Sequence, residues 1–145
     1  MVESEGSTLE EGVAERLLAR AREVRANAYA PYSNFQVGAA LLSSDGRVFT
    51  GVNVENASYG LTTCAERTAV STAVSEGARG FRAIAVVGPE DDVACPPCGS
   101  CRQILHELGR DMVVVMATEG GRPLERKLSV LLPGAFGGER LGEGR

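Results

Sequence analysis

Cys64-Ala65-Glu66 and Pro97-Cys98-Gly99-Ser100-Cys101 bring three cysteines and a glutamate together in two short stretches of the sequence. Zinc accepts thiolate sulfur readily, and a site with three protein ligands leaves the fourth tetrahedral position open for water, whereas a structural site normally closes all four. We therefore predict that Cys64, Cys98 and Cys101 bind one zinc ion per subunit. An open position beside a carboxylate indicates hydrolytic chemistry.

Glu66 follows two residues after a predicted ligand, so on the first turn of a helix its carboxylate can turn towards the open zinc position. A Cys-x-Glu followed by Pro-Cys-x-x-Cys is typical of zinc nucleobase deaminases, in which the glutamate is not a ligand. We expect Glu66 to take a proton from zinc-bound water, to deliver it to ring N3 as hydroxide attacks C4, and to help protonate the departing ammonia. The alternative is a glutamate that only offsets a helix dipole.

Hydrophobic periodicity predicts an amphipathic helix over residues 9–27, and β-rich runs over 35–42 and 47–54 flank the hairpin signal Asp45-Gly46. Thr62 or Thr63 is the predicted cap of the helix that carries Cys64. The remaining predicted elements are that helix, which ends at Gly77, helices over 98–108 and from Ser129, and strands over 83–87, 112–117 and 123–128. The sum is an α/β protein with a five-stranded mixed sheet and helices on both faces.

The chain of 145 residues is long enough for one domain, and its net charge of −4 argues against a nucleic-acid partner. No apolar run is long enough to span a membrane, and Met1–Glu11 is polar and acidic, unlike a secretory signal. We therefore expect a cytoplasmic protein with no membrane partner, whose cysteines are metal ligands or free thiols. The predicted organisation is a flexible segment over 1–8, one catalytic domain over 9–136 and a disordered tail over 137–145.

The chain resembles the small homotetrameric cytidine deaminases from about Leu17 to Phe136. The resemblance implies a three-layer αβα sandwich and zinc-dependent hydrolytic deamination of cytidine and 2'-deoxycytidine to uridine and 2'-deoxyuridine, with release of ammonia, in pyrimidine salvage. It also implies a homotetramer whose active sites are completed by neighbouring subunits. The motifs that carry the resemblance are Ala30-Pro31-Tyr32-Ser33, Phe35-Gln36-Val37-Gly38-Ala39-Ala40, Asn53-Val54-Glu55-Asn56-Ala57, Cys64-Ala65-Glu66-Arg67 and Pro97-Cys98-Gly99-Ser100-Cys101-Arg102-Gln103.

Three thiolates carry more negative charge than one zinc ion neutralises, so the site needs compensating positive charge. Helix N-termini at the cysteines supply part of it. Arg67 lies three residues after Cys64 and therefore shares its helical face. The resemblance implies that Arg67 hydrogen-bonds the cysteine sulfurs and tunes the metal; the alternative is a solvated helix arginine.

Asn53 and Glu55 alternate at the end of a predicted strand and so point to the same side. Their amide and carboxylate offer a donor and acceptors for a sugar diol, and the resemblance places them on the ribose hydroxyls; a turn cap and a solvated edge residue are the alternatives. By resemblance, Phe35 is a wall of the nucleoside pocket and the backbone of Ala65 contacts the base. The resemblance also implies that Phe136 stacks on the pyrimidine bound by a neighbouring subunit; the alternative is an aromatic residue that covers its own core.

Three other functions fit part of the pattern. A blasticidin S-type aminonucleoside deaminase has a similar zinc motif, but we expect such a protein to depart from this sequence after Asn53. A non-catalytic zinc module would need a fourth ligand, which Cys95 alone is placed to supply. A polynucleotide editor shares the motif, but the chain has no evident basic groove.

Overall fold

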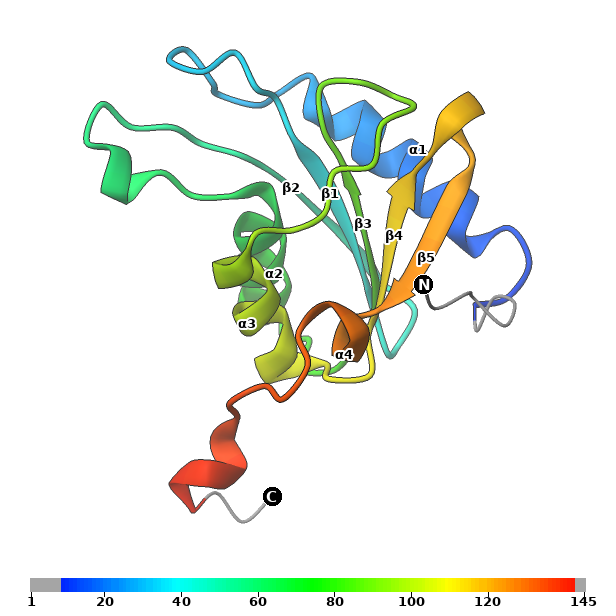
Figure 1. The fold of residues 1–145 in the computed structure, drawn as a ribbon, viewed down its shortest axis with the longest axis vertical. Coiled ribbons are helices and arrows are strands. Elements are labelled where there is room, and N and C mark those ends of the chain that lie inside the picture. Colours follow the sequence, from blue (N-terminus) through cyan, green and yellow to red (C-terminus); the bar gives the residue numbers. More distant parts are fainter. Residues whose placement is uncertain (1–8, 143–145) are drawn as a thin grey trace.

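A five-stranded mixed sheet forms the centre of the computed structural model, which describes residues 9–142 (Figure 1). Its strands are β1 (Gly38–Ser43), β2 (Val48–Val52), β3 (Phe81–Val87), β4 (Val113–Ala117) and β5 (Pro123–Lys127). They lie in the order β2-β1-β3-β4-β5. Only β3 and β4 are parallel, and the other neighbouring pairs in the sheet are antiparallel.

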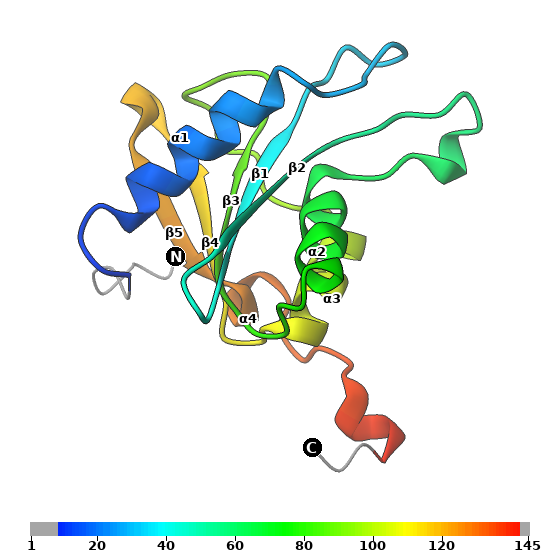
Figure 2. The same cartoon turned by 180° about the vertical axis from the view of Figure 1, so that it is seen from behind.

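Helices cover both faces of this sheet, as predicted. Figures 1 and 2 show α1 on one face and α2 and α3 on the other, and α3 makes the crossover between the parallel strands β3 and β4. The arrangement is the predicted three-layer αβα sandwich. The helices are α1 (Val13–Arg25), α2 (Ala65–Ser75), α3 (Gly99–Leu108) and α4 (Leu128–Leu131), with 3₁₀-helices η1 (Tyr59–Leu61), η2 (Glu119–Gly121) and η3 (Gly138–Leu141).

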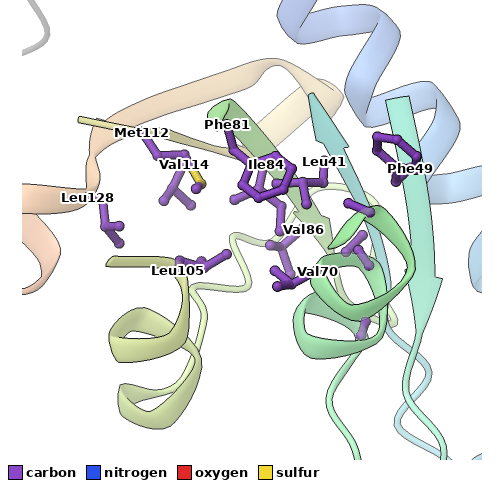
Figure 3. Packing of buried hydrophobic residues seen from close by; sticks show 14 of the residues in the cluster. Leu41, Phe49, Val70, Phe81, Ile84, Val86, Leu105, Met112, Val114 and Leu128 are labelled. Carbon is purple, nitrogen blue, oxygen red and sulfur yellow. The ribbon is translucent and has the colours of Figure 1, made fainter. Parts of the chain in front are cut away.

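Two hydrophobic layers lie on either side of the sheet, because successive side chains of a strand point to opposite faces. In β1, Leu41 belongs to the layer under α2 and α3, and Leu42 belongs to the layer under α1. Figure 3 shows the first layer, where Ile84 of β3 lies among side chains that include Val70 of α2 and Leu105 of α3. Both zinc-motif helices are thereby anchored on the same face.

Gly51 in β2 allows α2 to lie directly against the sheet. A Cβ atom at this position would lie 2.4 Å from the Ala69 nitrogen and 2.5 Å from the Ala65 oxygen. Such distances are too short for any side chain, so the glycine sets how closely the first turns of α2 approach β2. The N-terminus of α2, where Cys64 lies, is positioned by this contact.

Two predicted boundaries are wrong for identifiable reasons. The first strand begins at Gly38 rather than at Phe35, because the backbone of Phe35 and Val37 is hydrogen-bonded to the side chain of Asn53 instead of to a neighbouring strand. Neither threonine caps α2: the N-cap is Cys64 itself, with extended φ and ψ of −74° and 156°.

The structure leaves a few residues undescribed at each end of the chain. The segment predicted to be flexible, residues 1–8, lies outside the described residues, as do residues 143–145. Within the tail predicted to be disordered, residues 137–142 contain η3, and Arg110 forms an ion pair with Glu139 at 3.2 Å. Within residues 9–142, no helix is both long enough and apolar enough to cross a membrane.

Candidate active site

The three predicted ligands meet where two helices begin. Cys64 is the N-cap of α2, Cys98 is the N-cap of α3, and Cys101 lies in the first turn of α3. Their Sγ atoms all lie within 4.8 Å of one another. Ligand sulfurs at about 2.3 Å from a tetrahedral zinc ion are roughly 3.8 Å apart, so the cluster fits one zinc ion with little adjustment.

The environment of the cluster favours a thiolate at Cys64. A hydrogen bond from the Cys101 thiol, helped by the positive charge of Arg67, lowers the pKa of Cys64 to about 6, although burial opposes the shift. The same hydrogen bond and burial raise the pKa of Cys101. The unpaired N–H groups at the helix N-termini act in the same direction as Arg67. A thiolate is the form that binds metal, so the site is prepared for a cation.

Arg67 lies close enough to Cys64 for its charge to affect the thiol. Its Nη2 donates a hydrogen bond to the Thr62 carbonyl oxygen at 3.0 Å. Its Nε is buried and has no hydrogen-bond partner within the described chain. The guanidinium is thus held by one backbone contact, and its positive charge helps to lower the pKa of Cys64.

Glu66 is a buried carboxyl group in the first turn of α2, with only 5% of its surface exposed. Burial raises its pKa, and the negative charge of Cys64 adds to the shift, whereas its own backbone N–H and the charge of Arg67 oppose it. A buried carboxyl group with a raised pKa, beside three thiols that can bind a metal ion, is suited to accept and return a proton near neutral pH.

Asn53 and Glu55, the predicted ribose residues, both hold the loop that precedes β1. The Asn53 amide donates to the Phe35 carbonyl oxygen at 2.8 Å and accepts from the Val37 N–H at 2.9 Å. The Glu55 carboxylate accepts from the Ser33 hydroxyl and from the N–H groups of Tyr32 and Ser33, at 2.9 and 3.2 Å.

These contacts were not predicted from sequence, although Tyr32 and Ser33 lie within a recognised motif. They hold the pKa of Glu55 below its usual value, with the Ser33 hydrogen bond as the largest cause. The carboxylate therefore stays ionised and fixed at neutral pH.

A short antiparallel bridge connects the strand end that carries Asn53 and Glu55 to the residue before Cys64, in the cluster of three thiols. Val54 and Thr63 exchange two backbone hydrogen bonds of 2.9 Å. Val54 lies between Asn53 and Glu55, and Thr63 directly precedes Cys64. The predicted sugar residues and the predicted ligand are therefore neighbours across one bridge.

Phe35 and Cys95 line a pocket of about 380 Å³, and neither Glu66 nor any of the three clustered cysteines is among its lining residues. Phe35 is half exposed, so it is a wall residue and does not belong to the core. Burial raises the pKa of the Cys95 thiol, and the charge of Glu66 adds to the shift. Among the described residues, Cys95 is not part of the thiol cluster.

A larger cavity of about 1050 Å³ lies on the α1 face and is lined by none of the predicted site residues.

Ala65 and Phe136 lie in contrasting surroundings. Ala65 is fully buried at the start of α2, next to the ligand Cys64. Phe136 is 57% exposed, so it does not cover the core of its own chain. Figures 1 and 2 show the segment after α4 extending away from the sheet, past the C-terminal end of α3. The aromatic ring is therefore available to a neighbouring molecule.

Comparisons with known proteins agree with this geometry. Residues 12–117 match the family described as the cytidine and deoxycytidylate deaminase zinc-binding region. The chain is 52% identical over 128 residues to a cytidine deaminase of Halalkalibacterium halodurans, covering 88% of this chain and 96% of that protein.

Two crystal structures of cytidine deaminases are similar as well. The enzyme from Burkholderia pseudomallei has a TM-score of 0.78 and 50% identity, with 84% of this chain and 98% of that chain covered. The enzyme from Mycobacterium tuberculosis has a TM-score of 0.75 and 47% identity, with 85% and 96% covered. This chain therefore belongs to the zinc-binding cytidine and deoxycytidylate deaminase family.

Proposed function

We propose that this protein deaminates cytidine and 2'-deoxycytidine hydrolytically, consuming one water and releasing ammonia to give uridine and 2'-deoxyuridine. The observation that carries the proposal is the buried carboxyl group of Glu66, which lies beside three thiols within 4.8 Å of one another. A structural zinc site would close its fourth position with a protein ligand, and this cluster has three cysteines and an adjacent acid. Relatives named cytidine deaminase support the choice of substrate.

Each residue of the site has a separate role in the proposed reaction. Cys64, Cys98 and Cys101 would hold a zinc ion, which would lower the pKa of a bound water molecule so that it loses a proton at neutral pH. Glu66 accepts a proton from that water and delivers it to ring N3 as the hydroxide adds to C4; it then takes the proton of the new C4 hydroxyl and gives it to the amine, so that the C–N bond breaks and ammonia leaves. The raised pKa of Glu66 brings it closer to the pH at which these transfers must occur. Arg67 offsets the negative charge of the thiolates.

Recognition of the nucleoside rests on the side chains around the bridge. Asn53 and Glu55 bind the ribose hydroxyls with the hydrogen-bonding capacity that the loop contacts leave free, since a carboxylate has about four acceptor positions. Phe35 forms a wall of the base pocket, and the backbone at Ala65 contacts the base. The loop contacts of both polar residues fix them before substrate binds, which lowers the entropy cost of binding.

Assembly completes the site in this proposal. The exposed Phe136 stacks on the pyrimidine bound by a neighbouring subunit of a homotetramer. We place the enzyme in pyrimidine salvage in the cytoplasm.

A side-by-side turnover assay tests the substrate. Purified protein with quantified zinc is given cytidine, 2'-deoxycytidine or blasticidin S, and deamination is followed by ultraviolet absorbance. We expect turnover of both pyrimidine nucleosides and none of blasticidin S. Turnover of the antibiotic alone would replace this proposal with the aminonucleoside alternative. Strong competition by single-stranded DNA against cytidine would instead indicate a polynucleotide enzyme.

A further inference from the structure

Arg102 joins two parts of the chain that are distant in sequence. It follows Cys101 on α3, and its Nε donates a hydrogen bond of 2.8 Å to the carbonyl oxygen of Pro97, the residue before Cys98. Its Nη1 donates a hydrogen bond of 2.8 Å to the carbonyl oxygen of Leu131, the last residue of α4. One partly buried guanidinium therefore holds the turn that presents a metal ligand and the end of the helix that leads to the C-terminal segment.

The next residue on α3 extends the same connection. Gln103 Nε2 donates a hydrogen bond of 2.8 Å to the carbonyl oxygen of Phe136. The segment from Leu131 to Phe136 is thus fastened at its first and last residues by consecutive side chains of the helix that carries Cys98 and Cys101. The chain beyond α4 has its direction set by this zinc-motif helix.

We propose that Arg102 is a positioning residue that couples the Cys98 turn to the C-terminal segment, so that the metal site and Phe136 are held in one rigid unit. A guanidinium suits this task because its planar, permanently charged fork donates in several fixed directions, whereas a lysine ammonium is a single compact charge. The kinetic part of the inference rests on the proposed function, in which Phe136 stacks on a neighbour's substrate.

The test compares Arg102→Gln and Arg102→Lys with Arg79→Gln in zinc-loaded protein. Arg79 is a matched control, because its guanidinium also donates to two backbone carbonyls, those of Val74 and Ala78, but at the far end of α2. The measurements are hydrogen exchange of a peptide covering residues 129–137, the rate of zinc transfer to a chelator, and the KM and kcat for cytidine.

For Arg102→Gln we expect exchange in residues 129–137 and zinc transfer each to become about fivefold to tenfold faster, because charged hydrogen bonds stabilise both attachments. The KM should rise about tenfold with kcat changed less than about threefold, as expected when a residue that binds the base is displaced. Arg102→Lys should fall between the wild type and Arg102→Gln, since one ammonium can satisfy one of the two carbonyls. Arg79→Gln should match the wild type in all three measurements.

Exchange and zinc transfer unchanged in Arg102→Gln, or changed equally by Arg79→Gln, would overturn the proposal. Faster exchange with an unchanged KM would also overturn it, because Arg102 would then only stabilise the fold. If Arg102→Gln does not fold, Arg102→Lys decides the same questions. The exchange and zinc measurements need no substrate, so a wild-type protein without deaminase activity would refute the proposed function and leave the coupling to be judged by those two measurements.

Discussion

Cys98 and Cys95 are chemically identical residues of one loop, and the structure gives them different roles. Cys98 belongs to the cluster of three thiols, and Cys95 lines the pocket beside Phe35. We predict that Cys98→Ala loses zinc and activity, because removal of one of three ligands weakens metal binding severely. Cys95→Ala should keep one zinc ion per chain. Metal analysis after dialysis tests both, and zinc loss from the Cys95 variant would show that Cys95 closes the site.

The metal-binding cysteines and the glutamate were predictable from sequence because Cys-x-Glu and Pro-Cys-x-x-Cys together form a recognised motif, although the two parts lie far apart in the chain. The partners of Asn53 and Glu55 were not predictable in the same way. They lie in residues 32–37, where the loop includes Asn34 with a φ of 59°, and no periodic pattern specifies such a backbone. The hydrogen bonds from Arg102 and Gln103 of α3 to the C-terminal segment depend on the final position of α4, so they could not be predicted from the sequence either.

At the scale of elements, the close contact between β2 and α2 is the feature most open to test. Gly51→Ala adds one methyl group that would lie 2.4 Å from the Ala69 nitrogen. We expect a loss of about 1–3 kcal/mol in the free energy of unfolding, because overpacking forces the backbone to shift. Gly60→Ala is the control, since a Cβ there meets nothing within 4 Å.

Denaturant unfolding of both glycine variants measures this difference. The displaced N-terminus of α2 should also release zinc to a chelator faster in Gly51→Ala than in Gly60→Ala. Equal stability of the two variants would contradict the account of how α2 is seated.

The turn between β1 and β2 should show a pH signature. Hydrogen bonds from Arg47 and Ser43 lower the pKa of Asp45 from 3.8 to about 2. Because the folded-state pKa is depressed, the contribution of Asp45 to stability is present above pH 3.8 and is lost as the pH falls towards about 2. Asp45→Asn should therefore be less stable than the wild type at pH 6, and the difference should shrink below pH 4. Urea unfolding across this range tests it; a constant difference would argue against the ionised contacts.

The order of elements along the chain was predictable because binary patterns and the Asp-Gly turn are local signals. The strand boundary at Gly38 was not, since the residues before it are β-rich but bond to the Asn53 side chain. A side chain that competes with a neighbouring strand for backbone groups leaves no trace in hydrophobic periodicity.

For the whole molecule, the exposed Phe136 is the observation that most supports the proposal of a shared active site. Phe136→Ala should raise the KM for cytidine about tenfold, since stacking of a base on an aromatic side chain is worth roughly 1–3 kcal/mol. Co-expression of Phe136→Ala subunits with inactive Glu66→Gln subunits should restore sites with a normal KM, because in the proposed assembly Glu66 and Phe136 of one site come from different chains. Activity equal to that of the Phe136→Ala subunits alone would place both residues in the same chain.

The most direct test of the central claim is the activity and zinc content of Glu66→Gln. The amide keeps the size of the side chain and cannot accept and return a proton, so we predict one zinc ion per chain, an unchanged fold by circular dichroism, and a kcat for cytidine lowered by roughly 10²–10⁴. A variant that keeps wild-type turnover with its zinc bound would contradict the assignment of proton transfer to this buried carboxyl group.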